Sequence, residues 1–176
     1  MQAKKQQLRK VVRARIKALD AHEKARRATA LLRAVWDYAP FKQAQNVLLF
    51  WSLPDEIDTV PLIEHAHAAG KNVFLPVVVG DELVVKPYNP LTMQVGAFGI
   101  LEPQGEAVLP AQMDLIVVPG VAFDAQNNRM GRGKGFYDRL LAGLAVPTVG
   151  VAYAEQLYLA IPTQPHDIPL NHVIVV

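Results

Sequence analysis

The stretch Asp114–Gly120, D-L-I-V-V-P-G, decides the fold of this 176-residue chain. Its apolar run from Leu115 to Val118 is typical of a strand that is buried on both faces, and the Pro-Gly pair ends the strand. Comparable apolar runs occur along the chain at NVLLFWS (46–52), NVFLPVVV (72–79) and PTVGVAY (147–153). Strands of this kind belong to parallel sheets that are covered on both sides by helices.

Helical patterns alternate with these strands. We expect helices over residues 3–18, over a second segment that Asp20 caps and Pro40 ends, over Val60–Ala69, and from Phe136 to Leu144. Glu23 follows Asp20 by three residues, as in a capping box, and Asp58 is the expected cap of the third helix.

The remaining segments complete the sheet or connect its strands. Gly80-Asp81 turns the 72–79 strand into a hairpin partner, ELVVKPY, and Pro76 favours an edge position or a strand end. Residues 87–110 are expected to be mostly loop, Ala122–Asn128 a long polar loop, and HVIVV near the end a last short strand. The sequence therefore predicts a single domain, residues 1–176, with a three-layer α/β fold and a mostly parallel open sheet carrying helices on both faces.

Composition excludes several classes of protein. Apolar residues make up 51% of the chain and charged residues 19%, as in ordinary globular domains. Without cysteine the chain forms no disulfide, thiolate nucleophile or cysteine metal site. The basic, polar N-terminus contains no apolar signal segment, and no apolar run approaches the roughly 20 residues of a membrane helix. We therefore expect a cytoplasmic protein without a membrane partner.

The charge is distributed unevenly along the chain. Residues 1–33 hold 11 Lys and Arg against two acids, while the remaining residues hold 7 against 14. Lys5 and Arg9 are four residues apart, so they share one face of the first helix. Such a basic arm is either a solvated helix or a binding surface for nucleic acid, a membrane, the acidic body of the chain or a polyanionic small ligand.

The stretch Arg129–Arg139, R-M-G-R-G-K-G-F-Y-D-R, alternates three glycines with two cations before a predicted helix. Glycines let a ligand approach the backbone, and Arg132 and Lys134 add positive charge, so the pattern favours anion binding over a flexible exposed turn. The spacing is not that of a P-loop, because Phe136 stands where Ser or Thr would hold magnesium, and it is not that of a dinucleotide-binding fingerprint.

Three further features keep two interpretations each. Asp138, in the first turn of the predicted helix, either compensates the helix dipole or binds magnesium, and Tyr137 either stacks on a flat ring or packs. SLPDEID (52–58) gathers three carboxylates after the first strand, where Asp58 caps a helix and Glu56 is left for another role. The His166-Asp167 pair of PHDIPLNH lies in a loop that is either a solvated turn or part of a site.

Together these segments resemble the 5-formyltetrahydrofolate cyclo-ligase family, also called methenyltetrahydrofolate synthetases. The similarity extends over nearly the full length in order and spacing. It is carried by Lys5, Leu8 and Arg9, by SLPDEIDT, by LIVVPGVAFD, by RMGRGKGFYDR and by HDIPL. The chain departs from the family pattern at Trp51, where smaller aliphatic residues are familiar, and at Asn171, where aspartate is frequent.

The resemblance implies an ATP- and Mg²⁺-dependent ligase that converts 5-formyltetrahydrofolate to 5,10-methenyltetrahydrofolate, ADP and phosphate. ATP would contact Lys5, Arg9 and the loop from Arg129 to Tyr137, which comprises Arg129, Met130, Gly131, Arg132, Gly133, Lys134, Gly135, Phe136 and Tyr137. The folate would contact Trp51, Glu56 and the loop residues Arg132, Gly133, Lys134, Gly135 and Phe136.

The resemblance also implies individual roles. The implied catalytic residues are Arg132, Lys134 and Tyr137. Arg132 and Lys134 would stabilise the transferring phosphoryl group, and Tyr137 would pack against the folate or the formyl region. Asp138 and Asp167 would hold Mg²⁺. The implied enzyme is a monomer that uses folates, including polyglutamylated forms, and binds no nucleic acid.

Two other functions compete with this one. A sugar-phosphate isomerase or transferase on a similar sheet explains the anion-binding loop, but not the basic helix or the late His-Asp pair. A nucleic-acid-binding module explains the basic arm, but residues 1–33 lack a recognised motif and interleaved aromatic residues.

Overall fold

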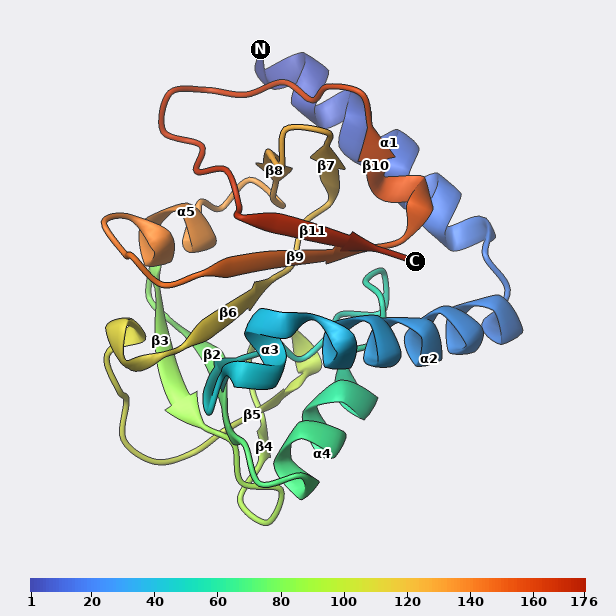
Figure 1. Cartoon of the computed structure of the whole chain (residues 1–176). Helices are drawn as coiled ribbons and strands as arrows, with labels where there is room; N and C mark the ends of the chain where they lie inside the picture. Colours follow the sequence, from blue (N-terminus) through green and yellow to red (C-terminus); the bar gives the residue numbers. More distant parts are fainter.

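The computed structural model describes residues 1–176, apart from the side chain of residue 97. Its central sheet has the order β11-β9-β6-β1-β2-β3 (Figure 1). All neighbouring strands in it are parallel except the β2–β3 hairpin. The strand bounds are β1 (Asn46–Leu48), β2 (Asn72–Val79), β3 (Glu82–Pro87), β6 (Leu115–Val118), β9 (Thr148–Ala152) and β11 (His172–Val175). The predicted mostly parallel sheet is confirmed.

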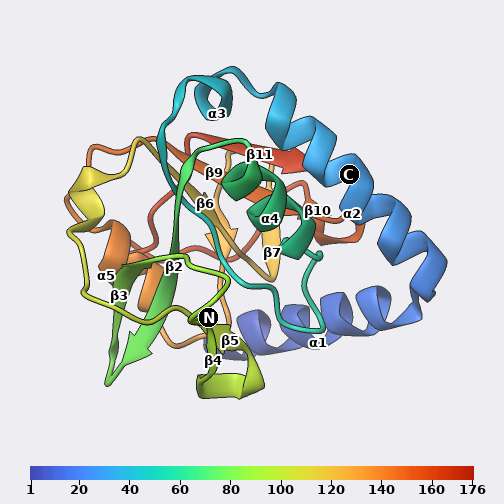
Figure 2. The same ribbon diagram turned by 90° about the horizontal axis from the view of Figure 1, so that it is seen from below.

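Helices cover both faces of this sheet. One face carries α2 (Ala21–Asp37), α3 (Ala39–Gln43) and α4 (Val60–Ala68), which lie together in the view from below (Figure 2). The other face carries α5 (Phe136–Leu141). Alternate residues of β6 show the division, because Val117 packs in the core under α2–α4 and Ile116 packs in the core with α5. The three-layer prediction is confirmed.

The first helix, α1 (Gln2–Ala18), lies beside β7 and β10 at the top of Figure 1 rather than on a face of the central sheet. Its buried positions Lys5, Val12 and Ile16 form one stripe along the helix. Val12 and Ile16 join the apolar core, while Lys5 lies further along the same side of the helix. The burial of Lys5 excludes a fully solvated basic arm.

A second, three-stranded sheet has the order β10-β7-β8 and was not predicted. Its strands are β7 (Ala122–Asp124), β8 (Arg129–Met130) and β10 (Leu157–Tyr158). The prediction of a long polar loop over residues 122–128 is therefore wrong for residues 122–124, which form β7, while residues 125–128 connect β7 to β8 without a regular element. Asp124 is 2% exposed, and its carboxylate accepts hydrogen bonds from the backbone N–H groups of Gln126, Asn128 and Ile161, which makes a polar residue tolerable inside a strand.

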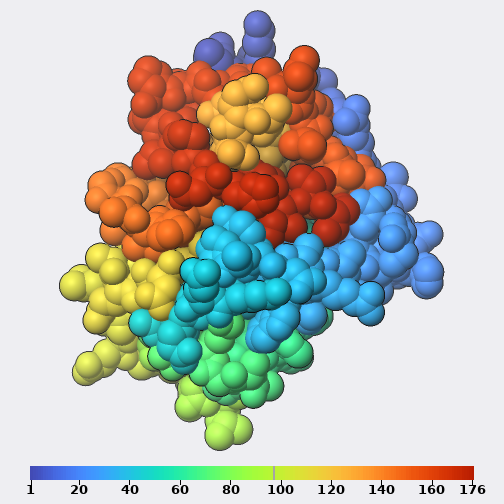
Figure 3. All heavy atoms as spheres, in the orientation of Figure 1, coloured from blue at the N-terminus to red at the C-terminus, as the bar shows by residue number. Residues whose placement is uncertain are grey.

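The tail of the chain surrounds the turn between β7 and β8. In Figure 3 the light-orange atoms of this segment are bordered by red atoms of the C-terminal segment. The backbone N–H of Leu170 donates to the carbonyl oxygen of Asn127 across this border. The last loop of the chain is thereby fixed beside the segment that leads into the glycine stretch.

Smaller elements refine the predicted boundaries. The stretch 87–110 is mostly loop, as predicted, with a short hairpin formed by β4 (Gln94–Val95) and β5 (Leu101–Glu102). Three 3-10 turns, η1 (Ala97–Gly99), η2 (Pro110–Gln112) and η3 (Ala154–Gln156), occur among the described residues. No helix in the described chain is both long and apolar enough to cross a membrane.

Local sequence signals explain several helix and strand ends. The Asp20 side chain caps α2 as predicted, but the Glu23 carboxylate binds Arg26 and Arg27 instead of completing a capping box. Thr59 is the N-cap of α4, and Asp58 supports the helix start by accepting from the N–H of Val60.

Pro76 lies inside β2, which is neither an edge strand of the sheet nor ended by the proline, so both predicted alternatives are wrong for the strand as a whole. The β1 partners of β2 are Asn72–Phe74, and β2 extends past them. The missing N–H of Pro76 therefore interrupts no pairing with β1.

Candidate functional site

A large cleft opens at the carboxyl ends of β1, β2 and β6. Its volume is about 1050 Å³, at or above the upper end of the range for small-molecule sites, roughly 300–1000 Å³. Polar walls come from α1, from the acidic loop after β1, from residues 129–139 and from the loop 164–168. An apolar wall comes from Pro76, Val78, Leu83, Phe98 and Ile100. The cleft therefore combines charged and polar walls with an apolar one.

The glycine stretch crosses the cleft between β8 and α5. Gly133 and Gly135 have φ values of 101° and 70°, in the left-handed region that favours glycine. The Arg9 side chain donates from Nε to the carbonyl oxygen of Gly131 at 2.9 Å, so α1 holds the loop directly. These glycines are thus required by the backbone conformation as well as by any ligand that approaches it.

Lys5 of α1 binds the loop before β11. Its Nζ lies 2.6 Å from Oδ2 of Asp167, and the two side chains are only 7% and 12% exposed. Burial pushes the pKa of Asp167 upwards, but the hydrogen bonds from Lys5 and from the N–H of Gln164, together with the charge of Lys5, hold it below its usual range. The contact joins residues 162 positions apart in sequence.

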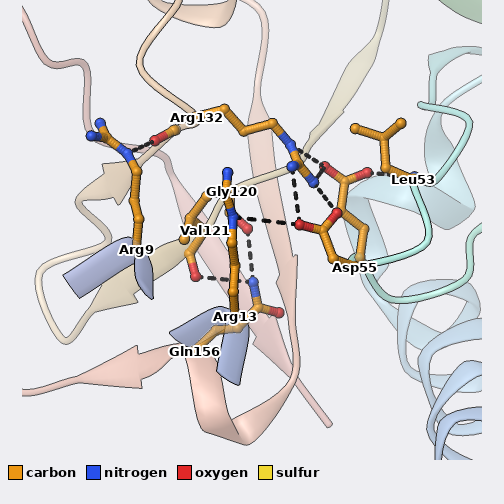
Figure 4. A network of polar contacts seen from close by, with 10 residues as sticks. Arg9, Arg13, Leu53, Asp55, Gly120, Val121, Arg132 and Gln156 are labelled. Carbon is orange, nitrogen blue, oxygen red and sulfur yellow. Dashed lines mark hydrogen bonds and ion pairs between the residues drawn. The ribbon is translucent and has the colours of Figure 1, made fainter. Parts of the chain in front are cut away.

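Arg132 connects the glycine stretch to the acidic loop after β1 (Figure 4). Its guanidinium donates from Nη1 to Asp55 at 3.0 Å and from Nη2 to both Asp55 and Glu56. Glu56 also accepts from the N–H of Leu53 at 2.9 Å. Burial raises the pKa of Glu56 above its ordinary value, although Leu53 and Arg132 oppose this effect.

Arg129 forms a buried ion pair on the opposite side of the loop. Its Nη2 lies 2.6 Å from Oδ1 of Asp138, and the Arg129 side chain is 4% exposed. The guanidinium also lies 5.7 Å from the ring centroid of Tyr137, whose pKa is raised first by burial and then by the charge of Glu56. The buried Nε of Arg129 has no hydrogen-bond partner among the described residues. This pair ties β8 to the first turn of α5.

The carboxylates of the cleft determine whether it can hold a metal ion. Asp138 and Asp167 each use one oxygen for a close ion pair, with Arg129 and Lys5. No cluster of three or more His, Cys, Asp or Glu side chains suited to a metal occurs among the described residues. Magnesium commonly uses only one or two protein carboxylates and completes its ligands with substrate phosphates and water. The residues therefore fit a metal that arrives with a nucleotide better than a resident metal site.

Comparisons with known proteins identify the family. The model of the 5-formyltetrahydrofolate cyclo-ligase family matches residues 1–176. The chain belongs to this family.

Individual cyclo-ligases agree with the assignment. The chain is 36% identical to the 5-formyltetrahydrofolate cyclo-ligase of Haemophilus influenzae, over 98% of this chain and 97% of that protein. It is 33% identical to the Escherichia coli K12 enzyme of the same name, over 93% and 96%. The NMR structure of Aquifex aeolicus 5,10-methenyltetrahydrofolate synthetase superposes with a TM-score of 0.88 at 37% identity, covering 97% of this chain and 89% of that one.

The structure brings every site residue expected from the cyclo-ligase resemblance to the wall of the one cleft. These residues are Lys5, Arg9, Trp51, Glu56, the loop from Arg129 to Asp138, and Asp167. The structure shows where these residues lie, although they come from both ends of the chain. Their individual roles stay predictions. Lys134 is exposed at the cleft, whereas Arg129 is buried and paired with Asp138. Lys134 is therefore freer than Arg129 to bind a ligand.

Some features of the cleft were missed by sequence reasoning. Asp55 was noted only as one of three carboxylates, yet it binds Arg132 with two hydrogen bonds. The apolar wall was not predicted at all, because its residues come from β2, β3 and the β4–β5 segment and share no local pattern.

The departure from the family pattern at Asn171 has a structural explanation. The Asn171 side chain accepts from the N–H and the hydroxyl of Thr148 at the start of β9, and it does not line the cleft.

Proposed function

We propose that this chain is an ATP-dependent ligase that cyclises 5-formyltetrahydrofolate to 5,10-methenyltetrahydrofolate and releases ADP and phosphate. One observation carries the proposal. In this member of the cyclo-ligase family, cations from α1 and from the glycine stretch line one large cleft together with a carboxylate loop and an apolar wall. Cations suit the triphosphate, and the apolar wall and carboxylates suit a pterin with its N–H edge.

The reaction needs an activated formyl group. A formamide carbon is a poor electrophile because the attached nitrogen donates electrons into the carbonyl. Transfer of the γ-phosphoryl group to the formyl oxygen converts that oxygen into a leaving group. N10 then attacks the carbon, the C–O bond breaks, inorganic phosphate leaves with the oxygen, and N10 loses its proton. The protein must align the ATP phosphate with the formyl oxygen and neutralise the charge of the moving phosphoryl group.

The nucleotide phosphates would lie between α1 and the glycine stretch. Lys5 and Arg9 reach this space from α1, and Lys134 reaches it from the loop. Arg132 belongs to the glycine stretch and donates to Glu56, which supports a role for it where the phosphoryl and formyl groups would meet. Arg132 and Lys134 would stabilise the transferring group, and preorganised cations of this kind are a main source of catalysis in phosphoryl transfer.

The folate would occupy the other part of the cleft. Glu56 is mostly buried and points a carboxylate into a space also bordered by Trp51 and Leu53. Its oxygens would accept hydrogen bonds from the pterin N–H groups, while Tyr137 would pack near the formyl group.

Asp138 and Asp167 would hold the Mg²⁺ that arrives with the nucleotide. Each carboxylate keeps an oxygen that is outside its close ion pair, which supports this role. The metal would neutralise phosphate charge, which is its usual part in phosphoryl transfer.

Several wider properties follow as part of the same proposal. The enzyme would work as a monomeric single domain over residues 1–176 in the cytoplasm. It would accept polyglutamylated as well as simple folates and would need neither nucleic acid nor a membrane.

One assay tests the proposal. Purified protein is mixed with Mg-ATP and 5-formyltetrahydrofolate, and the near-ultraviolet absorbance of the methenyl product is followed. We expect a gain in absorbance that requires ATP. The absence of any ATP-dependent gain would refute the proposed function, and salt-sensitive binding to nucleic acid without folate turnover would favour the competing function of the basic arm.

A further inference from the structure

Asp55 is part of a charge cluster that joins three segments of the chain (Figure 4). Its two carboxylate oxygens accept from Nη1 and Nη2 of Arg132 in a two-pronged contact. Nε of Arg13, on α1, lies 3.6 Å from the same carboxylate. Asp55 thus connects the glycine stretch with the helix that also carries Lys5 and Arg9.

Asp55 and Glu56 hold the same guanidinium in different ways. Glu56 is 12% exposed and is fixed by the N–H of Leu53, whereas Asp55 is 37% exposed. Asp55 takes the two terminal nitrogens of Arg132, and Glu56 receives Nε and a share of Nη2 through one oxygen. The two-pronged arrangement is the strong one, so Asp55 determines where the guanidinium lies.

Asp55 does not line the cleft, while both of its neighbours in the cluster, Glu56 and Arg132, do. A carboxylate in this position can affect a bound ligand by holding Arg132, without touching the ligand itself. We propose that Asp55 is a positioning residue that keeps Arg132 from closing fully onto Glu56, so that Glu56 stays open to the folate.

This inference rests on the proposed function, because it assigns Glu56 to folate binding. Without the charge of Asp55, the remaining carboxylate in contact with Arg132, among the described residues, is Glu56. Arg132 then turns its terminal nitrogens toward Glu56 and occupies the acceptor oxygens that the folate needs. Loss of a carboxylate that does not line the cleft would therefore weaken substrate binding, because Arg132 would compete with the folate for Glu56.

The test is a double-mutant cycle on binding of 5-formyltetrahydrofolate, measured by calorimetry without ATP. We expect Asp55→Asn to weaken binding about tenfold in the wild-type background, as expected for one perturbed charged contact. In an Arg132→Ala background the same change should alter binding less than about twofold. Asp55→Glu, which keeps the charge, should bind within about threefold of wild type.

A matched control removes a carboxylate outside this cluster. Glu82 pairs with Arg139 at 3.5 Å and is 63% exposed, so Glu82→Gln makes the same chemical change outside the cluster and should leave binding unchanged. Melting curves of all variants show whether they fold.

Three outcomes overturn the inference: equal weakening by Asp55→Asn in both backgrounds, no weakening in either, or no recovery with Asp55→Glu. Failure of the wild-type protein to bind 5-formyltetrahydrofolate would instead refute the proposed function.

Discussion

Replacing Lys5 with methionine tests how α1 is attached to the rest of the molecule. The change removes the charge while keeping most of the side chain's length, and it leaves Asp167 with the N–H of Gln164 as its close partner. Removing one partner of a fully buried ion pair costs roughly 3–5 kcal/mol, and losing a charged hydrogen bond costs roughly 1.5–3 kcal/mol. Asp167 is 12% exposed and keeps one hydrogen-bond donor. We therefore expect Lys5→Met to lower the free energy of unfolding by about 1.5–3 kcal/mol.

The assay is thermal unfolding at two pH values. A loss of about 1.5–3 kcal/mol lowers Tm by about 3–12 °C in a domain of this size. Lys5 holds the pKa of Asp167 below its usual range in the folded protein. The stabilisation from the pair is therefore complete above the unfolded-state pKa of about 3.9 and is lost as the pH falls through the lower folded-state pKa. The difference in Tm between wild type and Lys5→Met should therefore be largest at pH 7 and should become smaller below about pH 4.

Lys4→Met is the matched control, because Lys4 is exposed on the same turn of α1. We expect its Tm to stay close to that of wild type at both pH values. Equal Tm values for Lys5→Met and wild type at pH 7, or a difference that does not change with pH, would show that the Lys5–Asp167 pair does not attach α1.

Three further substitutions test the glycine stretch. Gly131→Ala would place a Cβ 2.8 Å from Nη1 of Arg129, a side chain that Asp138 holds in place. Urea unfolding should therefore show a free energy of unfolding about 1–3 kcal/mol lower than that of wild type. An unchanged free energy of unfolding would mean that the loop relaxes to accept the methyl group. Arg132→Ala should lower kcat about 100-fold or more with a Tm within a few degrees of wild type, and near-normal turnover would contradict its proposed role in phosphoryl transfer. Asp138→Asn should raise the magnesium concentration needed for half-maximal activity. An unchanged magnesium titration would show that Asp138 has only a structural role, in its contact with Arg129 and at the start of α5.

Much of the fold could be predicted because its signals are local. The apolar run before Pro119 and the similar run ending at Ala152 identify parallel strands without knowledge of their partners. Gly80 with a φ of 61° marks the β2–β3 turn, and Asp20 marks the start of α2. Each of these signals acts through the backbone within a few residues.

The β7–β8 hairpin could not be predicted in the same way. Asp124 and the polar residues after it have the composition of a loop. The Asp124 carboxylate is instead satisfied inside the protein, partly by the N–H of Ile161, 37 residues further on. A buried polar residue is stable only with partners, and distant partners are invisible in a local pattern.

The candidate site shows the same division. The glycine stretch predicts an anion-binding site by its own sequence, and the family resemblance adds Lys5, Glu56 and Asp167 to the expected site residues. The contact between Asp55 and Arg132 spans 77 residues and has no local signature, so only the folded chain reveals which carboxylate holds that guanidinium.

The fate of the formyl oxygen tests the proposed reaction most directly. 5-Formyltetrahydrofolate labelled with ¹⁸O in the formyl group is incubated with the protein and Mg-ATP, and the released inorganic phosphate is analysed by mass spectrometry. Phosphorylation of the formyl oxygen predicts one ¹⁸O atom in each phosphate released with methenyl product. Methenyl product accompanied by unlabelled phosphate would contradict it.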